Sequence, residues 1–210
     1  MKKERKKTGL KNCDRRTALR WTLWGAAALV APPGLIARRR SSAYWGEGVL
    51  PRVRDYVRSC YDYAWYVQQR CGIPVWGTFA VCIHESDAGR SPLATIAKNH
   101  HGIKALRDWD GPLYCKEVGR DPRDGFIHCE YYRRYDSDQE GFNDFGRFLA
   151  HPRYRRLPRS PFADCREWVE ALHEAGYAED EAYTEGLLKR IEDYRLEELK
   201  YRRPAPVYRA

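Results

Sequence analysis

The sequence predicts a mainly α fold with one small β element. Apolar and aromatic residues recur at helical spacing in several long stretches, whereas the middle of the chain breaks into short β-rich runs between turn residues. The 210 residues suffice for one packed domain and a short appendage. With 43% hydrophobic and 13% aromatic residues, the composition supports a packed core and excludes a disordered chain.

Two helices are expected in the first half of the body. The first spans residues 52–71 and ends at Gly72. The second begins near Pro74 and ends in the turn residues 86–89, which places Glu85 at its C-terminal end. Their apolar stripes consist of Val53, Tyr56, Val57, Cys60, Tyr61, Ala64, Val67 and Cys71 in the first helix, and of Trp76, Phe79, Ala80 and Ile83 in the second.

Residues 113–135 predict a hairpin, because runs rich in Val, Phe, Ile and Tyr flank an Asp-Pro and an Asp-Gly pair. Cys115 and Cys129 would lie opposite each other across its antiparallel strands. We therefore expect a Cys115–Cys129 disulfide, which would close a loop of about 15 residues and add roughly 3 kcal/mol of stability. The alternative pairs Cys60 with Cys71 and leaves the hairpin cysteines to other partners.

Three more helices are expected after the hairpin. Ser137 and Glu140 form a capping box in front of an apolar stripe. A second helix follows Ser160-Pro161 and stops at Gly176, and the last one runs over residues 181–199.

Positive charge is concentrated at the N-terminus. Residues 1–40 hold 12 Lys/Arg and two acidic residues, so this head carries a net charge of +10 and residues 41–210 carry −1. An uncharged run over residues 21–37 is typical of an export signal or an inner-membrane anchor, and indicates a periplasmic or cell-envelope protein. A nearly neutral body disfavours a nucleic-acid partner. The expected parts are the head with its signal or anchor (1–43), the folded domain (44–203) and a tail (204–210).

The cysteine pattern agrees with export. Apart from one cysteine in the head, six remain, and an even set is typical of disulfides formed in an oxidising compartment. None falls in a Cys-x-x-Cys arrangement, and His84-Glu85 lacks the second histidine of a zinc motif because position 88 is alanine. We therefore expect no metal and no cofactor. Buried free thiols are the alternative for each cysteine.

Glu85 is the main candidate for chemistry. It lies at a helix end among apolar neighbours such as Phe79 and Ile83, where partial burial would raise its pKa and keep it protonated near neutrality. A general acid needs this condition. The alternative is a solvated glutamate at a helix terminus with no part in chemistry.

Several blocks of sequence around and beyond Glu85 share one arrangement with a known family. They comprise Ala-Val-Cys-Ile-His-Glu-Ser at 80–86, Ser-Pro-Leu-Ala at 91–94, Lys-Asn-His-His-Gly-Ile-Lys-Ala at 98–105, Tyr-Arg-Arg-Tyr-Asp-Ser at 132–137, Phe-Asn-Asp-Phe at 142–145, Pro-Arg-Tyr at 152–154 and Ala-Gly-Tyr-Ala at 175–178. Together they resemble the peptidoglycan glucosaminidases of flagellar and autolysin type, glycoside hydrolase family 73. The chain departs from that family at His84 and at residues 87–89, where the family carries Gly-Trp-Gly.

The resemblance implies a lysozyme-like α lobe and a small β-hairpin lobe with a substrate groove between them. It implies hydrolysis of peptidoglycan glycan strands after N-acetylglucosamine, with Glu85 as general acid. It places Glu117 as a second carboxylate on the β element and Tyr177 beside the catalytic pair. The further residues that it assigns to substrate contact are Tyr135, Asn99 and Tyr154.

Two of these assignments have structural alternatives, and two other functions remain open. Glu117 is equally consistent with an exposed ion-paired strand residue, and Tyr135 with a packing residue beside the Ser137 cap. A lytic transglycosylase would cut the same polymer with one dominant glutamate and no water. A non-catalytic wall-binding module of an envelope-spanning assembly would keep the fold, but the retained Glu85 favours catalysis.

Overall fold

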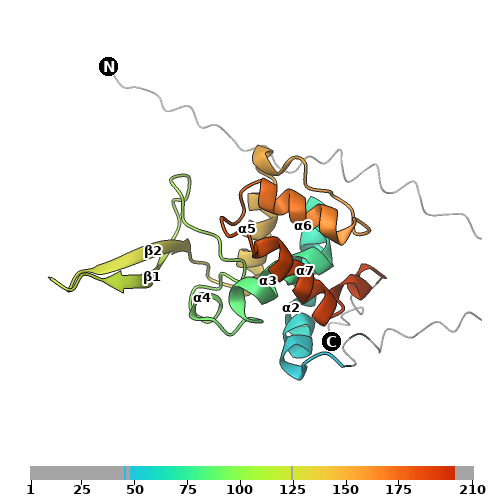
Figure 1. Cartoon of the computed structure of the whole chain (residues 1–210), viewed down its shortest axis with the longest axis horizontal. Helices are drawn as coiled ribbons and strands as arrows, with labels where there is room; N and C mark the ends of the chain where they lie inside the picture. The colour runs from blue at the N-terminus through green and yellow to red at the C-terminus, as the bar shows by residue number, and fades with distance from the viewer. Residues whose placement is uncertain (1–44, 46–47, 124, 202–210) are drawn as a thin grey trace, which may run out of the picture. The chain divides into compact units, whose positions relative to one another are not determined.

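The computed structural model describes residue 45, residues 48–123 and residues 125–201. Within them the chain is mainly α, with one two-stranded sheet, as the sequence predicts (Figure 1). The expected head (1–43) and tail (204–210) lie outside the described residues. The elements in order are α2 Pro51–Cys71, α3 Val75–Ser86, α4 Pro92–Thr95, β1 Leu113–Arg120, β2 Ile127–Arg133, α5 Asp138–Leu149, η2 Pro152–Tyr154, α6 Cys165–Glu174, α7 Tyr183–Asp193 and η3 Leu196–Tyr201.

The helix α3 forms the centre of the helical body. Ten of its twelve residues are buried, and it packs against α2, α6, α7 and η3. Gly77 allows the indole of Trp168 from α6 to approach, since a Cβ there would lie 3.1 Å from that ring. A helix that is apolar on nearly all sides is stable only when neighbours surround it. The position of Glu85 is therefore fixed by the core.

The helix α2 follows the predicted apolar stripe and ends as expected at Gly72, which adopts φ +71°. Its straight course rules out the alternative Cys60–Cys71 disulfide. Eleven residues of α-helix separate the two cysteines by about 16 Å, more than twice the Cα separation that a disulfide spans. Cys60 is instead a buried thiol near the Ser59 hydroxyl.

The strands β1 and β2 pair antiparallel and project from the helical body (Figure 1). The predicted Cys115–Cys129 disulfide is confirmed, with the two Cα atoms 5.3 Å apart. The register is Cys115 opposite Tyr131 and Glu117 opposite Cys129, and a bulge follows Glu117. The disulfide therefore links diagonal neighbours on one face of the hairpin.

Two helix boundaries differ from the prediction. The helix α6 begins at Cys165 because Asp164 accepts the hydrogen bond from the Glu167 N–H, so the cap lies four residues beyond Ser160. The last predicted helix is broken. It ends at Asp193, and Arg195 adopts a left-handed φ of +52° before the 3-10 helix η3 begins.

A buried polar cluster anchors the hairpin to the helical body. The Asp144 carboxylate on α5 pairs with the Arg133 guanidinium at the end of β2, at 3.0 Å, and accepts a 2.8 Å hydrogen bond from Tyr135. Asp144 is 4% exposed. A charge at this depth persists only because it is paired.

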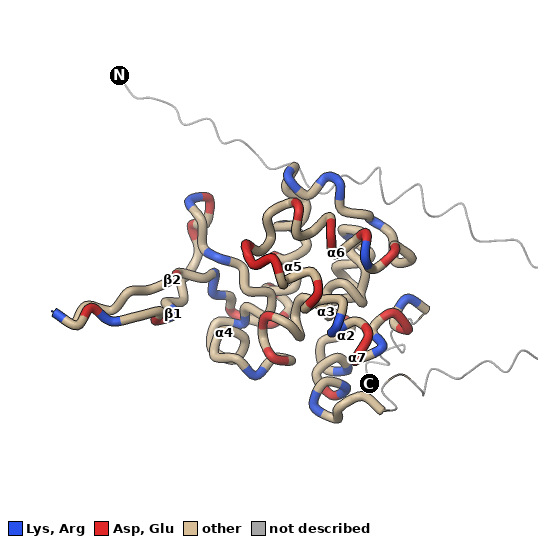
Figure 2. The backbone as a smooth tube through the Cα atoms, viewed as in Figure 1, with Lys and Arg blue, Asp and Glu red and all other residues tan. Residues whose placement is uncertain are grey.

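Charge is mixed over the described residues. Figure 2 shows basic and acidic residues interleaved along the helices and the hairpin. This distribution agrees with the nearly neutral body that the sequence gives for residues 41–210. In the described part of the chain, no helix has both the length and the apolar character to cross a bilayer.

We predict that Asp144→Asn lowers the free energy of unfolding by about 3 kcal/mol, because Arg133 loses its buried counter-charge and keeps only the exposed Asp108 carboxylate, at 3.7 Å. Urea unfolding followed by circular dichroism measures the change. The matched control is Asp193→Asn, which removes an exposed pair with Lys189 and should cost less than about 1 kcal/mol. Equal losses in the two variants would contradict the proposed role of burial.

Candidate active site

Glu85 occupies the last turn of α3, where the buried helix reaches the surface of the helical body. Burial raises the pKa of its carboxyl, and the Tyr183 hydroxyl and the positive charge of Lys116 oppose that rise. The expectation of a raised pKa is confirmed. The carboxyl is thus biased toward the protonated form that a general acid needs.

The backbone of Gly102 lies close against this carboxyl. Its backbone has φ +65°, and a Cβ built on it would lie 2.6 Å from Glu85 Oε2. Only glycine combines this conformation with so close an approach. The segment after α4 is therefore shaped around the Glu85 side chain.

Two tyrosines from the C-terminal part of the chain close the other side. The Tyr177 hydroxyl donates a 2.6 Å hydrogen bond to the His101 carbonyl, and its ring lies 6.0 Å from that of Tyr183. The Tyr183 hydroxyl is buried beside Glu85. Within the described residues, no partner meets it with the geometry of a hydrogen bond. The resemblance implies a role for Tyr177, whereas Tyr183 is brought to the site by the fold.

His84, which replaces a smaller residue of the family pattern, packs at the back of this cluster. Its ring meets the edge of Tyr183 at 5.2 Å, and a Cβ at Gly186 would lie 2.8 Å from it. Burial lowers the pKa of His84, and the nearby Arg190 lowers it further. A neutral His84 therefore helps to position Tyr183.

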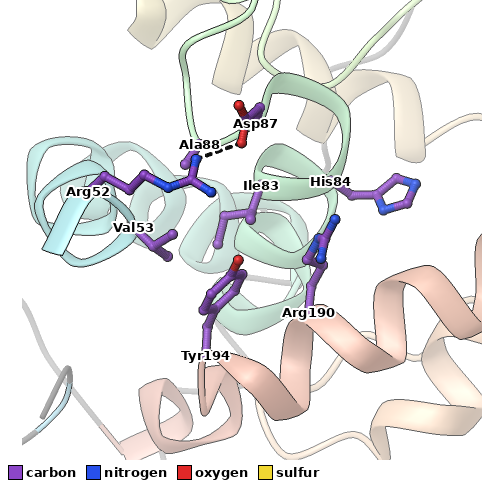
Figure 3. Close-up of a pocket in the computed structure, with 8 residues that line it drawn as sticks. All are labelled: Arg52, Val53, Ile83, His84, Asp87, Ala88, Arg190 and Tyr194. Atoms are coloured by element: carbon purple, nitrogen blue, oxygen red, sulfur yellow. Dashed lines mark hydrogen bonds and ion pairs between the residues drawn. The ribbon is translucent and has the colours of Figure 1, made fainter. Parts of the chain in front are cut away.

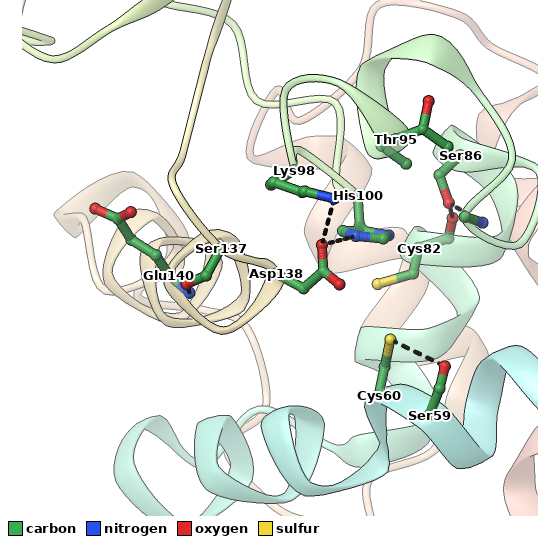
Figure 4. Close-up of polar contacts among 12 residues, drawn as sticks. Ser59, Cys60, Cys82, Ser86, Thr95, Lys98, His100, Ser137, Asp138 and Glu140 are labelled. Carbon is green, nitrogen blue, oxygen red and sulfur yellow. Dashed lines mark hydrogen bonds and ion pairs between the residues drawn. The ribbon is translucent and has the colours of Figure 1, made fainter.

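A polar chain behind Glu85 supports the loop that carries Gly102. The His100 ring makes a 2.9 Å hydrogen bond with the Tyr56 hydroxyl. Its other ring nitrogen lies 3.0 Å from the Asp138 carboxylate, which the Lys98 ammonium also approaches (Figure 4). Cys82 contacts His101 at 3.0 Å. These contacts join α2, α3 and α5 to the loop and leave it little freedom.

Asn99 is buried, and its side chain binds the backbone of neighbouring segments. It is 1% exposed, and its side chain makes hydrogen bonds of 2.9 to 3.0 Å with the backbone of Ile103 and Arg133. In this conformation the amide has no open surface to offer a sugar, and its hydrogen bonds order the loop after α3. A substrate contact of Asn99 stays a prediction.

Tyr135 and Tyr154 are likewise buried. The Tyr135 hydroxyl donates to Asp144, which matches the packing alternative, and Tyr154 is 0% exposed with its ring against Phe148 and Tyr177. Neither side chain presents a face on which a sugar could stack. Their direct contact with substrate stays a prediction.

Glu117 lies on the exposed face of the hairpin that carries the disulfide. Its carboxylate is 3.5 Å from the Arg120 guanidinium, and the side chain is 52% exposed. This exposed ion pair matches the structural alternative for Glu117. A catalytic role for Glu117 stays a prediction.

A cavity of about 210 Å³ lies elsewhere, between α2, α3 and α7 (Figure 3). Arg52 and its ion-pair partner Asp87 line it with Arg190 and Tyr194. Glu85 does not line this cavity. Within residues 48–123 and 125–201, no group of three His, Cys, Asp or Glu side chains is arranged to hold a metal.

Comparison with known proteins identifies the family. Residues 61–196 match the Glucosaminidase family, described as mannosyl-glycoprotein endo-beta-N-acetylglucosaminidase. The chain belongs to this family. It is 30% identical over 95 residues to the peptidoglycan hydrolase FlgJ of Vibrio parahaemolyticus, covering 44% of the chain and 30% of that protein. It is 29% identical over 118 residues to FlgJ of Vibrio cholerae, covering 54% and 34%. The glucosaminidase chain thus spans about a third of these relatives.

Solved structures of peptidoglycan hydrolases share the fold of this chain. A peptidoglycan hydrolase mutant from Sphingomonas sp. A1 is 25% identical, with TM-score 0.58 over 70% of the chain and 97% of that structure. The truncated glycoside hydrolase domain of Salmonella typhimurium FlgJ is 24% identical, with TM-score 0.56 over 68% and 97%. The expected lysozyme-like fold of this glucosaminidase is confirmed.

We predict that Gly102→Ala reduces the turnover of the glucosaminidase at least tenfold, because the new Cβ displaces Glu85 Oε2. The matched control is Gly125→Ala, which has φ +74° but open space around it. Both variants should lose about 1 to 2 kcal/mol of stability from the left-handed backbone. Loss of activity in both, or in neither, would contradict the contact with Glu85.

Proposed function

We propose that this glucosaminidase hydrolyses the glycan strand of bacterial peptidoglycan after N-acetylglucosamine, with Glu85 as its general acid. The observation that carries the proposal is the Glu85 carboxyl at the end of α3, whose pKa is raised by burial. Family membership supplies the reaction class, and relatives such as FlgJ are named peptidoglycan hydrolases.

The surroundings of Glu85 support proton transfer. The leaving sugar oxygen needs a proton as the glycosidic bond breaks, and a protonated carboxyl delivers it. Gly102 lies against the carboxyl, and the Tyr183 hydroxyl is close enough to lower its pKa. We propose Tyr177 as a positioning residue, because it holds the His101 carbonyl next to Gly102.

We further propose that the protein acts outside the cytoplasm, in the periplasm or cell envelope. The Cys115–Cys129 disulfide supports this location, since such bonds persist in oxidising compartments. The basic head and the apolar run 21–37 support export or anchoring at the inner membrane. We also propose that the protein works within an envelope-spanning assembly, whose components would be its partners.

We predict that Glu85→Gln lowers turnover on purified peptidoglycan by at least 100-fold without changing the circular dichroism spectrum, because an amide cannot give up the proton. The matched control is Glu174→Gln, at the end of α6 and exposed. Mass spectrometry of wild-type products should find N-acetylglucosamine at the reducing end. Anhydro-muramyl ends would instead identify a lytic transglycosylase, and an active Glu85→Gln would remove the acid from this position.

The pH dependence offers a second test. Activity requires protonated Glu85, so it should fall as pH rises through the raised pKa of that group. Lys116 lowers the pKa of Glu85 through its charge, so Lys116→Gln should move the alkaline limb of the kcat/KM profile to higher pH. Lys189→Gln, on the exposed face of α7, should leave the limb in place. A shift to lower pH in Lys116→Gln would contradict the assignment.

A further inference from the structure

The cavity between α2, α3 and α7 is separate from the Glu85 carboxyl, and we call it the α7 cavity. Arg52 and Val53 of α2 line one side, and Arg190 of α7 and Tyr194 at its C-cap line another (Figure 3). Its volume is about 210 Å³. A water molecule takes about 30 Å³ in the liquid, so this space equals roughly seven waters. It is smaller than most pockets that enclose whole ligands, and it suits the end group of a molecule.

The α7 cavity lies where the chain departs from the family pattern. His84 and Ala88 both line it, and the pattern has a tryptophan at the position of Ala88. Ala88 contributes only a methyl group to the wall, whereas an indole at this position would reduce the space. The cavity is therefore tied to residues that distinguish this chain from the pattern.

The cations around the cavity differ in their partners. The Arg52 guanidinium lies 2.7 Å from the Asp87 carboxylate. Arg190 is half-buried, and in the part of the chain that the structure describes no carboxylate lies within ion-pair distance of it. The preceding residue, Lys189, does have a partner on the exposed side of α7. Partial burial of an unpaired charge is unfavourable, and an anion in the cavity would offset this cost.

His84 adds no positive charge to the cavity. Burial and the charge of Arg190 lower the pKa of its ring, although Asp180 opposes this shift. The charged groups of the lining are therefore Arg52, Asp87 and Arg190. Two cations and one anion leave a net charge of +1.

Polar donors and apolar groups border the same space. The Tyr194 hydroxyl lies beside it with Arg190, and neither side chain has a hydrogen-bond partner among the described residues. Val53 and Ile83, which are 0% and 4% exposed, supply an apolar wall. A guanidinium fork matches a carboxylate with two parallel hydrogen bonds. The apolar wall suits a small alkyl group attached to that carboxylate.

We propose that the α7 cavity binds a carboxylate carried on a small alkyl group. A monoanion balances the net charge of +1, whereas a doubly charged phosphate would place surplus negative charge beside Asp87. The peptide stems of peptidoglycan carry alkyl carboxylates, and free short-chain acids are a second source of the same chemistry. The first source rests on the proposed function, whereas the binding itself does not.

The direct test uses N-acetyl-alanine as the probe and its uncharged amide as the matched control. In the ¹⁵N-labelled full chain, the acid should shift the Arg190 side-chain N–H resonance saturably, and the amide should bind at least about tenfold more weakly. Arg190→Gln should weaken binding of the acid by a similar factor, measured on the backbone amides of residues 87–89. Lys189→Gln, on the exposed side of the same helix, should leave the affinity within about twofold. Equal binding of acid and amide, or unchanged affinity in Arg190→Gln, overturns the proposal.

Ala88→Trp tests the space instead of the charge. Ala88 has φ +52° and already carries a Cβ, so a larger side chain adds no new backbone strain. We expect this variant to keep the circular dichroism spectrum of the wild type and to lose affinity for the acid at least about tenfold. Retained affinity in the folded variant overturns the proposal. Arg190→Gln changes only a half-exposed side chain, so it decides the question where Ala88→Trp does not fold.

Hydrolysis assays distinguish the two sources of the carboxylate. With the wall polymer as the source, N-acetyl-alanine and Arg190→Gln should each raise the KM for peptidoglycan at least about threefold, with kcat little changed. With a free acid as the source, the probe binds but leaves this KM unchanged. A wild type that binds the probe and fails to cut peptidoglycan refutes the proposed function and leaves the binding site standing. A wild type that cuts peptidoglycan but does not bind the probe overturns the binding site alone.

Discussion

The buried Asp144 carboxylate is the interaction on which the arrangement of the site depends. Two strands alone are marginally stable in water, so this hairpin takes its orientation from its attachment to the helical body. Asp144 provides that attachment by binding Arg133 from the end of β2 and the hydroxyl of Tyr135. The Asn99 amide adds a second link through the Arg133 carbonyl. Both groups are buried, and they anchor the base of the hairpin to the helical body.

The acidic residues of the helical body and of the hairpin lie in different environments. Glu85 belongs to a helix whose neighbours exclude water, and its charged form is disfavoured. Glu130 lies on a half-exposed strand, where Lys104 and Tyr132 stabilise its charge. The pKa of the same residue type therefore shifts in opposite directions, because one glutamate belongs to a core helix and the other to an edge strand. A lysozyme-like fold supplies both environments within one small domain.

The sequence was sufficient for the features that depend on local pattern. Helical spacing located α2 and α3, and a pair of cysteines around a turn located the disulfide. It was insufficient where the outcome depends on packing in three dimensions. The faces of the hairpin follow from a register and a bulge after Glu117 that no local signal encodes. A role for Tyr183 could not be predicted, because its burial against Glu85 is what distinguishes it among 15 tyrosines.

The cysteines divide according to the same distinction between core and edge. Burial raises the pKa of Cys60 to about 11 and of Cys165 to about 12, so these core thiols are poor nucleophiles and resist oxidation. Cys115 and Cys129 lie on the projecting hairpin, which has little core of its own, and they form the disulfide. Cross-linking a loop of this length stabilises it by about 3 kcal/mol in the chain-entropy model. The register places the bond on the face of the hairpin that also carries Glu117 and Tyr131, so it can stiffen the hairpin without involving the opposite face.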